Sequence, residues 1–226
     1  MKAMLLAAGR GERLRPLTDR LPKPLVEAGG KPLIAWHLER LAAAGFREVV
    51  VNVAHLGERL VERIGDGGAY GVEVAWSREA EPLETAGGLA WARALLGDAP
   101  FLLVNSDIYC EYDFGALRER ALGAMLAHLV LVPNPPHRPN GDFSLSAERV
   151  GNDAAPRYTY CGIALIDPEL YAGVRAGDKA PLAPWLYAAA AQGRLSGEIY
   201  HGLWRDIGTA ERLDELRGLL DARGGA

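Results

Sequence analysis

Short apolar runs alternate with amphipathic stretches along the first half of the chain. The apolar runs, rich in Val and Leu, predict strands at 1–7, 48–53, 71–76 and 100–105. Between them, apolar positions recur at helical spacing and predict helices from Pro32 to Gly45, at 55–64 and at 85–96. Alternating strands and helices indicate a mostly parallel sheet with right-handed crossovers. In such sheets ligands bind beyond the carboxyl ends of the strands.

The second half is less regular and predicts a mixed sheet. Strands are expected at 127–132, 142–145, 157–166 and 198–201, and helices at 113–123, 167–169, 181–192 and 210–220. Thr209 is a plausible N-cap of the last helix, and four prolines between Pro133 and Pro139 predict a loop. We expect a single domain, 1–226, in which residues 1–110 bind a nucleotide and residues 111–226 bind a second substrate.

The loop after the first strand combines glycines with basic residues. Gly9 and Gly11 allow the backbone to pass close to a bulky ligand, and Arg13 and Lys23 supply positive charge near them. The prolines on either side of Lys23 fix its backbone, which is unusual for a surface lysine. Because the net charge of the chain is −4, this local basic cluster favours a small phosphorylated ligand over a nucleic acid.

Two aspartates at predicted element edges suggest a metal site. Asp107 follows the apolar run that ends at Asn105, and Asp206 stands just before the last helix. A lone aspartate after a strand is more often a cap or turn residue. Two such carboxylates, together with substrate phosphates, are the usual ligands of Mg²⁺.

Other motifs limit the classes of protein. No Walker motif occurs, and the pair Gly9-x-Gly11 has Leu14 where a dinucleotide fingerprint needs a third glycine. The five histidines show no metal-ligand spacing, and no nucleophile elbow occurs. The two cysteines lie far apart, no apolar run approaches the roughly 20 residues of a membrane span, and the first residues lead directly into a strand. We therefore expect a cytoplasmic protein without a membrane partner.

The first loop resembles the opening motif of the nucleoside-diphosphate-sugar pyrophosphorylases, also called sugar-1-phosphate nucleotidylyltransferases. The matching residues are Leu-Ala-Ala-Gly-x-Gly-x-Arg-Leu-x-Pro-Leu-Thr from residue 6 and Pro-Lys-Pro-Leu from residue 22. The resemblance continues in Glu-Thr-Ala-Gly-Gly from residue 84, Asn-Ser-Asp from residue 105 and Trp-Arg-Asp-Ile-Gly-Thr from residue 204. Within the family, residues 81–85 and 141–143 are most similar to the branch that uses N-acetylmuramate 1-phosphate.

The resemblance implies a fold, a reaction and a set of site residues. The fold is the Rossmann-like α/β three-layer sandwich of the nucleotide-diphospho-sugar transferases, similar to the GT-A glycosyltransferases. The reaction is a Mg²⁺-dependent attack of a sugar 1-phosphate on the α-phosphorus of a nucleoside triphosphate, here expected to be UTP. By position, the resemblance implies catalytic roles for Arg13 and Lys23, nucleotide binding by Ala8, Gly9, Gly11, Glu12, Arg13, Lys23, Thr85 and Gly88, sugar-phosphate binding by Asn105, Asp142 and Gly162, and metal binding by Asp107 and Asp206.

The sequence departs from the family pattern at three places. Residues 143–160 contain no lysine, whereas many relatives carry a Glu-Glu-Lys-Pro segment there that contacts the sugar and its phosphate. Glu84 stands where many relatives have glycine, and Ser106 precedes the metal aspartate where glycine is frequent.

Several alternatives remain open from the sequence. Mannose, heptose or glucose 1-phosphate with GTP or dTTP, or phosphocholine with CTP, would be other substrate pairs for the same chemistry. A glycosyltransferase on the same fold usually carries Asp-x-Asp, whereas residues 107–109 read Asp-Ile-Tyr. A non-catalytic nucleotide sensor would be expected to lack the lysine and the metal aspartates. The sequence allows a monomer or a small homo-oligomer.

Overall fold

Nine strands form one mixed sheet in the computed structural model, which describes residues 1–153 and 155–224. In spatial order they are β5 (Glu73–Arg78), β4 (Glu48–Val53), β1 (Ala3–Leu6), β6 (Phe101–Asn105), β11 (Arg157–Ile166), β8 (Ala127–Val132), β12 (Leu195–Ile199), β10 (Arg149–Gly151) and β9 (Phe143–Ser146). The first four are parallel, β11 is antiparallel to both neighbours, and β8 and β12 are again parallel. Both halves of the chain therefore contribute strands to the same sheet.

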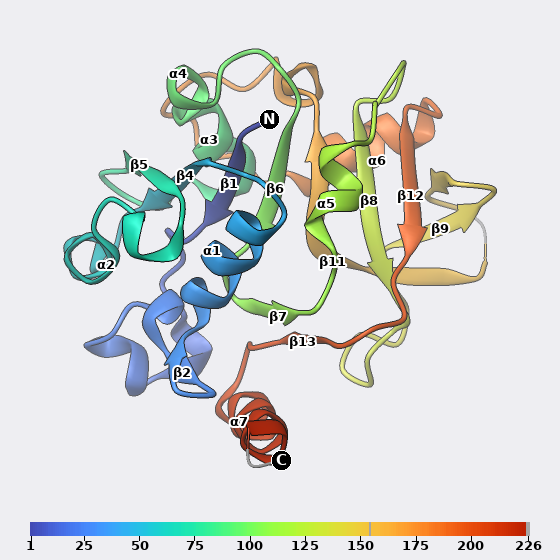
Figure 1. Cartoon of the computed structure of the whole chain (residues 1–226). Coiled ribbons are helices and arrows are strands. Elements are labelled where there is room, and N and C mark those ends of the chain that lie inside the picture. Colours follow the sequence, from blue (N-terminus) through green and yellow to red (C-terminus); the bar gives the residue numbers. More distant parts are fainter. Residues whose placement is uncertain (154, 225–226) are drawn as a thin grey trace.

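Helices cover both faces of this sheet (Figure 1). One face packs against α1 (Leu33–Ala43), α2 (Gly57–Ile64) and α5 (Phe114–Arg118), and the other against α3 (Glu84–Trp91), α4 (Arg93–Leu96) and α6 (Ala183–Ala191). Within β1, Leu5 faces the first of these cores and Met4 the second, which is the period-2 alternation of a strand. The predicted fold class, a three-layer α/β sandwich with a mixed and mostly parallel sheet, is confirmed. None of the described helices combines the length and the apolar character needed to cross a membrane.

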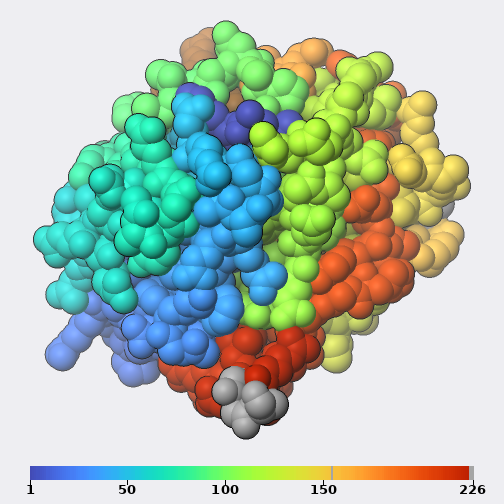
Figure 2. All heavy atoms as spheres, in the orientation of Figure 1, coloured from blue at the N-terminus to red at the C-terminus, as the bar shows by residue number. Residues whose placement is uncertain are grey.

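A third, smaller core lies at one edge of the molecule and joins the two ends of the chain. Helix α7 (Ala210–Gly224) packs there against the hairpin β2 (Glu27–Ala28) and β3 (Lys31–Pro32) and against the ribbon β7 (Ile108–Cys110) and β13 (Trp204–Asp206). Figure 2 shows the last helix in red beside the first loops in blue at the lower edge. Short 3₁₀ turns complete the fold at Glu12–Leu14, Leu17–Asp19, Lys23–Leu25, Gly68–Tyr70 and Pro168–Tyr171.

Several predicted elements differ in extent from the observed ones. The helix expected at 85–96 is divided at Ala92 into α3 and α4, and the helix expected at 113–123 is only α5. Pro32 is the N-cap of α1, one position before the helix that it was expected to begin. The strand expected at 198–201 lies at 195–199, because parallel pairing with β8 sets its position. Strands β7, β10 and β13 were not predicted, since three residues are too few to show a period.

His37 ties α1 to the start of β7. Its side chain is fully buried, and its Nε2 lies 2.7 Å from the carbonyl oxygen of Ile108, the residue after Asp107. Burial, together with the nearby charge of Arg40, lowers the pKa of His37 from 6.5 to about 4. The neutral imidazole therefore donates from Nε2 to this carbonyl and fixes the backbone next to Asp107.

This histidine predicts acid-sensitive stability. Because the pKa of His37 is lower in the folded than in the unfolded chain, protonation of His37 favours the unfolded state. Its contribution to the free energy of unfolding is complete above pH 6.5 and falls by up to about 3 kcal/mol as the pH falls to 4. In H37Q, the amide keeps a donor at similar reach and does not titrate. Urea unfolding between pH 7.5 and 4.5 should therefore show a shallower loss of stability for H37Q than for the wild type.

The matched control is H55Q, because His55 is exposed. It should follow the wild-type pH dependence. Equal slopes for H37Q and the wild type would contradict the buried neutral imidazole.

Candidate active site

A cavity of about 820 Å³ opens beyond the carboxyl ends of β1 and β6. The predicted site residues that line it are Ala8, Gly9, Gly11, Glu12, Arg13, Lys23, Thr85, Asn105 and Asp107. The first loop, the start of α3 and the end of β6 thus meet in one hollow. Gly88, Asp142, Gly162 and Asp206 are not in its lining.

The glycine loop closes tightly on itself around Gly11. This residue has φ +64°, and a Cβ there would lie 3.0 Å from Cγ2 of Thr18 and 3.1 Å from Cβ of Lys23. Thr18 also donates a hydrogen bond of 2.8 Å from Oγ1 to the Gly11 carbonyl. Only glycine fits this left-handed, crowded position without strain, so the loop's own contacts define its turn.

Lys23 reaches across the cavity to Asp107. Its side chain is 9% exposed, and its Nζ lies 2.7 Å from Oδ2 of Asp107, whose side chain is 38% exposed. The end of β6 is in turn held to β1, because Ser106 donates from Oγ to the Leu6 carbonyl at 2.5 Å. The Lys23 ammonium group thus has one fixed partner and one side that faces the cavity, as a phosphate-binding cation requires.

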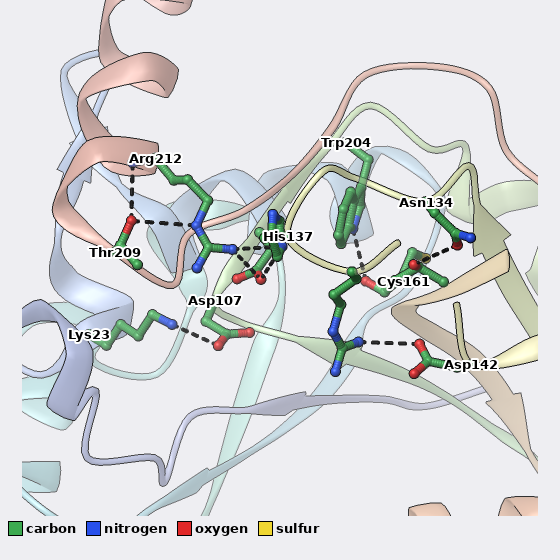
Figure 3. A network of polar contacts seen from close by, with 12 residues as sticks. Lys23, Asp107, Asn134, His137, Asp142, Cys161, Trp204, Thr209 and Arg212 are labelled. Carbon is green, nitrogen blue, oxygen red and sulfur yellow. Dashed lines mark hydrogen bonds and ion pairs between the residues drawn. The ribbon is translucent and has the colours of Figure 1, made fainter. Parts of the chain in front are cut away.

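The ribbon of β7 and β13 brings the two predicted metal aspartates together. Asp206 is opposite Ile108 in this antiparallel pair, and Ile207 donates its N–H to the Asp107 carbonyl at 3.0 Å. In Figure 3 Arg212 lies close to His137, and Asp107 lies nearby with Lys23. Oδ2 of Asp206 is 2.6 Å from Nη1 of Arg212 and 3.3 Å from Nε2 of His137.

This donor set fits a magnesium ion better than a transition metal. A transition-metal site usually needs three or more protein ligands, and residues 1–153 and 155–224 contain no cluster of three or more His, Cys, Asp or Glu side chains that could hold a metal ion by themselves. Asp107 and Asp206 each keep one carboxylate oxygen, Oδ1, that accepts no hydrogen bond from the described residues. Two carboxylates with free oxygens, supplemented by substrate phosphates, suit Mg²⁺.

Asn52 and Glu79 form a buried network that the sequence interpretation missed. Oδ1 of Asn52 accepts from the Ala7 N–H at 2.8 Å, and its Nδ2 donates to Oε1 of Glu79 at 2.7 Å. Oε2 of Glu79 accepts from the Leu83 N–H at 2.9 Å, and burial raises the pKa of this carboxyl. The network joins the end of β1 to the start of α3, the two sides of the cavity. A polar Asn inside the run Val-Val-Val-Asn-Val was the available signal.

The start of α3 is shaped by close backbone contacts. Glu84 lines the cavity and has φ +62°, a left-handed conformation that favours glycine. Gly87 allows residues 178–180 to approach, because its Cβ would lie 2.2 Å from the Asp178 carbonyl oxygen. This contact brings Lys179, a second missed residue, into the cavity lining. Gly88 lies beneath, where a Cβ would meet Asn52 and Glu79 at 2.9 Å.

Of the predicted sugar-side residues, Asn105 lines the cavity, whereas Asp142 and Gly162 do not. Gly162 has φ +85°, and a Cβ there would lie 2.7 Å from Nδ2 of Asn105, so its lack of a side chain makes room for Asn105. Asp142 accepts from the Tyr160 N–H at 2.9 Å and pairs with Arg138 at 3.2 Å. These contacts hold β9 and β11 in place, and substrate contacts by Asp142 and Gly162 stay predictions.

The fold and the cavity define a nucleotidyltransferase. Residues 2–145 match the family model described as "Nucleotidyl transferase", and the chain belongs to this family. A putative glucose-1-phosphate thymidylyltransferase from Bacillus anthracis, solved in complex with a sucrose, superposes with a TM-score of 0.85 over 97% of this chain and 95% of that one. At 19% identity, this match concerns the fold alone.

Curated relatives narrow the class to the sugar-1-phosphate nucleotidylyltransferases. The chain is 51% identical to the N-acetylmuramate alpha-1-phosphate uridylyltransferase of Neisseria meningitidis serogroup B, over 98% of this chain and 99% of that protein. It is 34% identical to the mannose-1-phosphate guanyltransferase of Aspergillus fumigatus, over 92% of this chain and 61% of that protein. The family membership and the enzyme class predicted from the sequence are confirmed.

Loss of the Asn52 amide should destabilise the protein. In N52L the Ala7 N–H loses its partner and the buried Glu79 carboxylate loses one of its two, which should cost about 2–4 kcal/mol. Urea unfolding at pH 7.5 measures this cost. N140L is the control, since Asn140 is exposed, and it should change stability by less than about 0.5 kcal/mol. A stability of N52L equal to that of N140L would contradict the network.

Proposed function

We propose that this enzyme transfers a uridylyl group from UTP to N-acetylmuramate 1-phosphate. The products are the UDP-sugar and pyrophosphate. The observation that carries the proposal is the meeting of the glycine loop, Arg13, Lys23 and Asp107 in one cavity. The relative of 51% identity, matched over nearly its whole length, supports the choice of sugar and base.

The chemistry needs positioning and charge neutralisation. An oxygen of the sugar phosphate attacks the α-phosphorus of UTP while the bond to the bridging oxygen breaks, and pyrophosphate leaves with that electron pair. The attacking phosphate monoester is already ionised near neutral pH, so no general base is needed. The main obstacle is repulsion between two anions, which fixed cations at the reacting atoms overcome.

The chain's own cations are placed for this work. Arg13 and Lys23 line the cavity, and Lys23 is held by its pair with Asp107. Arg13 would take two phosphate oxygens with its planar fork, and Lys23 would contact the phosphate nearest the reacting centre. Asp107 and Asp206 would hold Mg²⁺, which supplies further neutralisation of the phosphates when bound.

The other end of the cavity suits a flat base. Ala8 and Thr85 line it, and small residues at the start of α3 let a ring approach the backbone. Lys179 adds a cation from the second half of the chain. Glu81 and Glu84 complete the rim on this side.

The identity of the sugar 1-phosphate is the part of the proposal for which the sequence left most alternatives open. N-acetylmuramate carries a carboxylate, and the loop from Pro133 to Pro139 carries two basic side chains: His137, whose Nε2 lies 3.3 Å from Oδ2 of Asp206, and Arg138. This supports an acidic sugar over mannose, which relatives of lower identity use. We place the reaction in the cytoplasm, as a step that returns recovered cell-wall sugar to the nucleotide-sugar pool.

A pyrophosphate-release screen tests the proposal. The purified protein is assayed with UTP, GTP, dTTP and CTP, each against N-acetylmuramate, N-acetylglucosamine, mannose and glucose 1-phosphates, with and without EDTA. Release should be fastest for UTP with N-acetylmuramate 1-phosphate and should stop with EDTA. Faster release with another pair would contradict the sugar or the base, and no release with any pair would contradict the activity itself.

A further inference from the structure

Arg212 pairs with the carboxylate of Asp206. Its Nη1 lies 2.6 Å from Oδ2 of Asp206, and the two side chains are 17% and 21% exposed. The same Nη1 lies 2.8 Å from Nε2 of His137. A guanidinium can only donate, so Nε2 of His137 accepts in this contact. Arg212 is therefore the charge that balances Asp206.

The guanidinium of Arg212 also converges with that of Arg13 at the cavity wall. A Cβ on Gly208, which lines the cavity, would lie 2.5 Å from Nη2 of Arg212 and 3.1 Å from both Nη1 and Nη2 of Arg13. Arg13 makes no ion pair with any of the described residues. Two guanidinium groups crowd together only at a cost, unless an anion lies between them. The absence of a side chain at Gly208 leaves room for both.

The position of Arg212 in its helix gives the helix no benefit. It is the third residue of α7, where the exposed N–H groups make the end of the helix positive and disfavour a cation. Its link to the cap is weak, since the contacts with Oγ1 of Thr209 are 3.5 Å long. The placement is explained instead by Asp206 on one side and the cavity on the other.

We propose that Arg212 is a movable counter-ion, which neutralises Asp206 in the free enzyme and turns to the triphosphate beside Arg13 when a divalent cation binds Asp206. This inference rests on the proposed function for the identity of the triphosphate. A rotation of the Arg212 side chain exchanges the Asp206 carboxylate for the triphosphate as its anionic partner. The metal then balances Asp206, so Asp206 is never left as an uncompensated charge. The same exchange gives the polyphosphate a second guanidinium only once the metal is present.

The test compares two affinities in R212Q. Binding of Mn²⁺ without nucleotide is followed by electron paramagnetic resonance, and binding of UTP in saturating Mg²⁺ is followed by calorimetry. Removal of the competitor for Asp206 should raise the Mn²⁺ affinity several-fold. Loss of a charged donor to phosphate should lower the UTP affinity about tenfold.

Two further variants separate this role from a structural one. R217Q removes an arginine of the same helix that pairs with Asp214 at 3.1 Å, away from the cavity, and should leave both affinities unchanged. R212K keeps the charge but loses the planar fork, so its Mn²⁺ affinity should stay close to wild type while its UTP affinity falls. Circular dichroism checks that each variant is folded.

Opposite changes of the two affinities in R212Q would support the proposal. An unchanged or lower Mn²⁺ affinity, or an unchanged UTP affinity, would overturn it. If the wild type itself bound no UTP in Mg²⁺, the proposed function would fail as well. Normal UTP binding by the wild type with no effect in R212Q would contradict the role of Arg212 alone.

Discussion

The pairing of β7 with β13 determines where the charges of this enzyme lie. Each strand has three residues, yet their register places Asp206 opposite Ile108 and bonds Ile207 to the Asp107 carbonyl. Residues about a hundred positions apart in the chain are thereby joined at the rim of one cavity. Both strands are anchored from outside: β7 by His37, and β13 by the Trp204 Nε1–H, which donates to the Cys161 carbonyl at 2.9 Å.

The site keeps its charges in balance before any substrate arrives. Lys23 is largely buried, and a buried ammonium without a partner would cost several kcal/mol, so its bond to Asp107 stabilises it. Asp206 is neutralised in the same way by Arg212. Each ion pair contains one group suited to a metal and one suited to phosphate. If the metal bound the aspartates and the phosphates bound Lys23 and Arg212, each charged group would exchange one partner of opposite charge for another. No unpaired charge would be left in the site, so the cavity can be preformed without destabilising the fold.

Much of the fold and part of the site could be predicted from the sequence. The central strands and their flanking helices show clear hydrophobic periodicity. In the first loop, the combination of glycines with Arg13 and Lys23 is itself enough to indicate phosphate binding. The split between α3 and α4 could not be predicted, because the periodicity continues across it. The ribbon of β7 and β13 could not be predicted either, because its short strands form only by pairing with each other in the folded chain. Lys179 was missed for a similar reason, since it reaches the cavity only because Gly87 lets residues 178–180 approach α3.

For the two aspartates, the sequence suggested the shared site but not the ion-pair partners. Their residue type and position after predicted elements suggested a shared metal site, and the ribbon explains how they could share one. Their present partners, Arg212 and Lys23, were not suggested by any spacing. Partner choice among charged side chains depends on local three-dimensional geometry, and the sequence pattern does not contain it.

A crystal structure with Mn²⁺ and a non-hydrolysable UTP analogue tests the central claim most directly. The account predicts an anomalous difference peak in contact with carboxylate oxygens of both Asp107 and Asp206, at roughly 2.0–2.2 Å from each. The ribbon of β7 and β13 should be unchanged around it. A metal ion held by the phosphates and one aspartate alone, with Asp206 still bound to Arg212, would contradict the claim that the ribbon builds a two-carboxylate site.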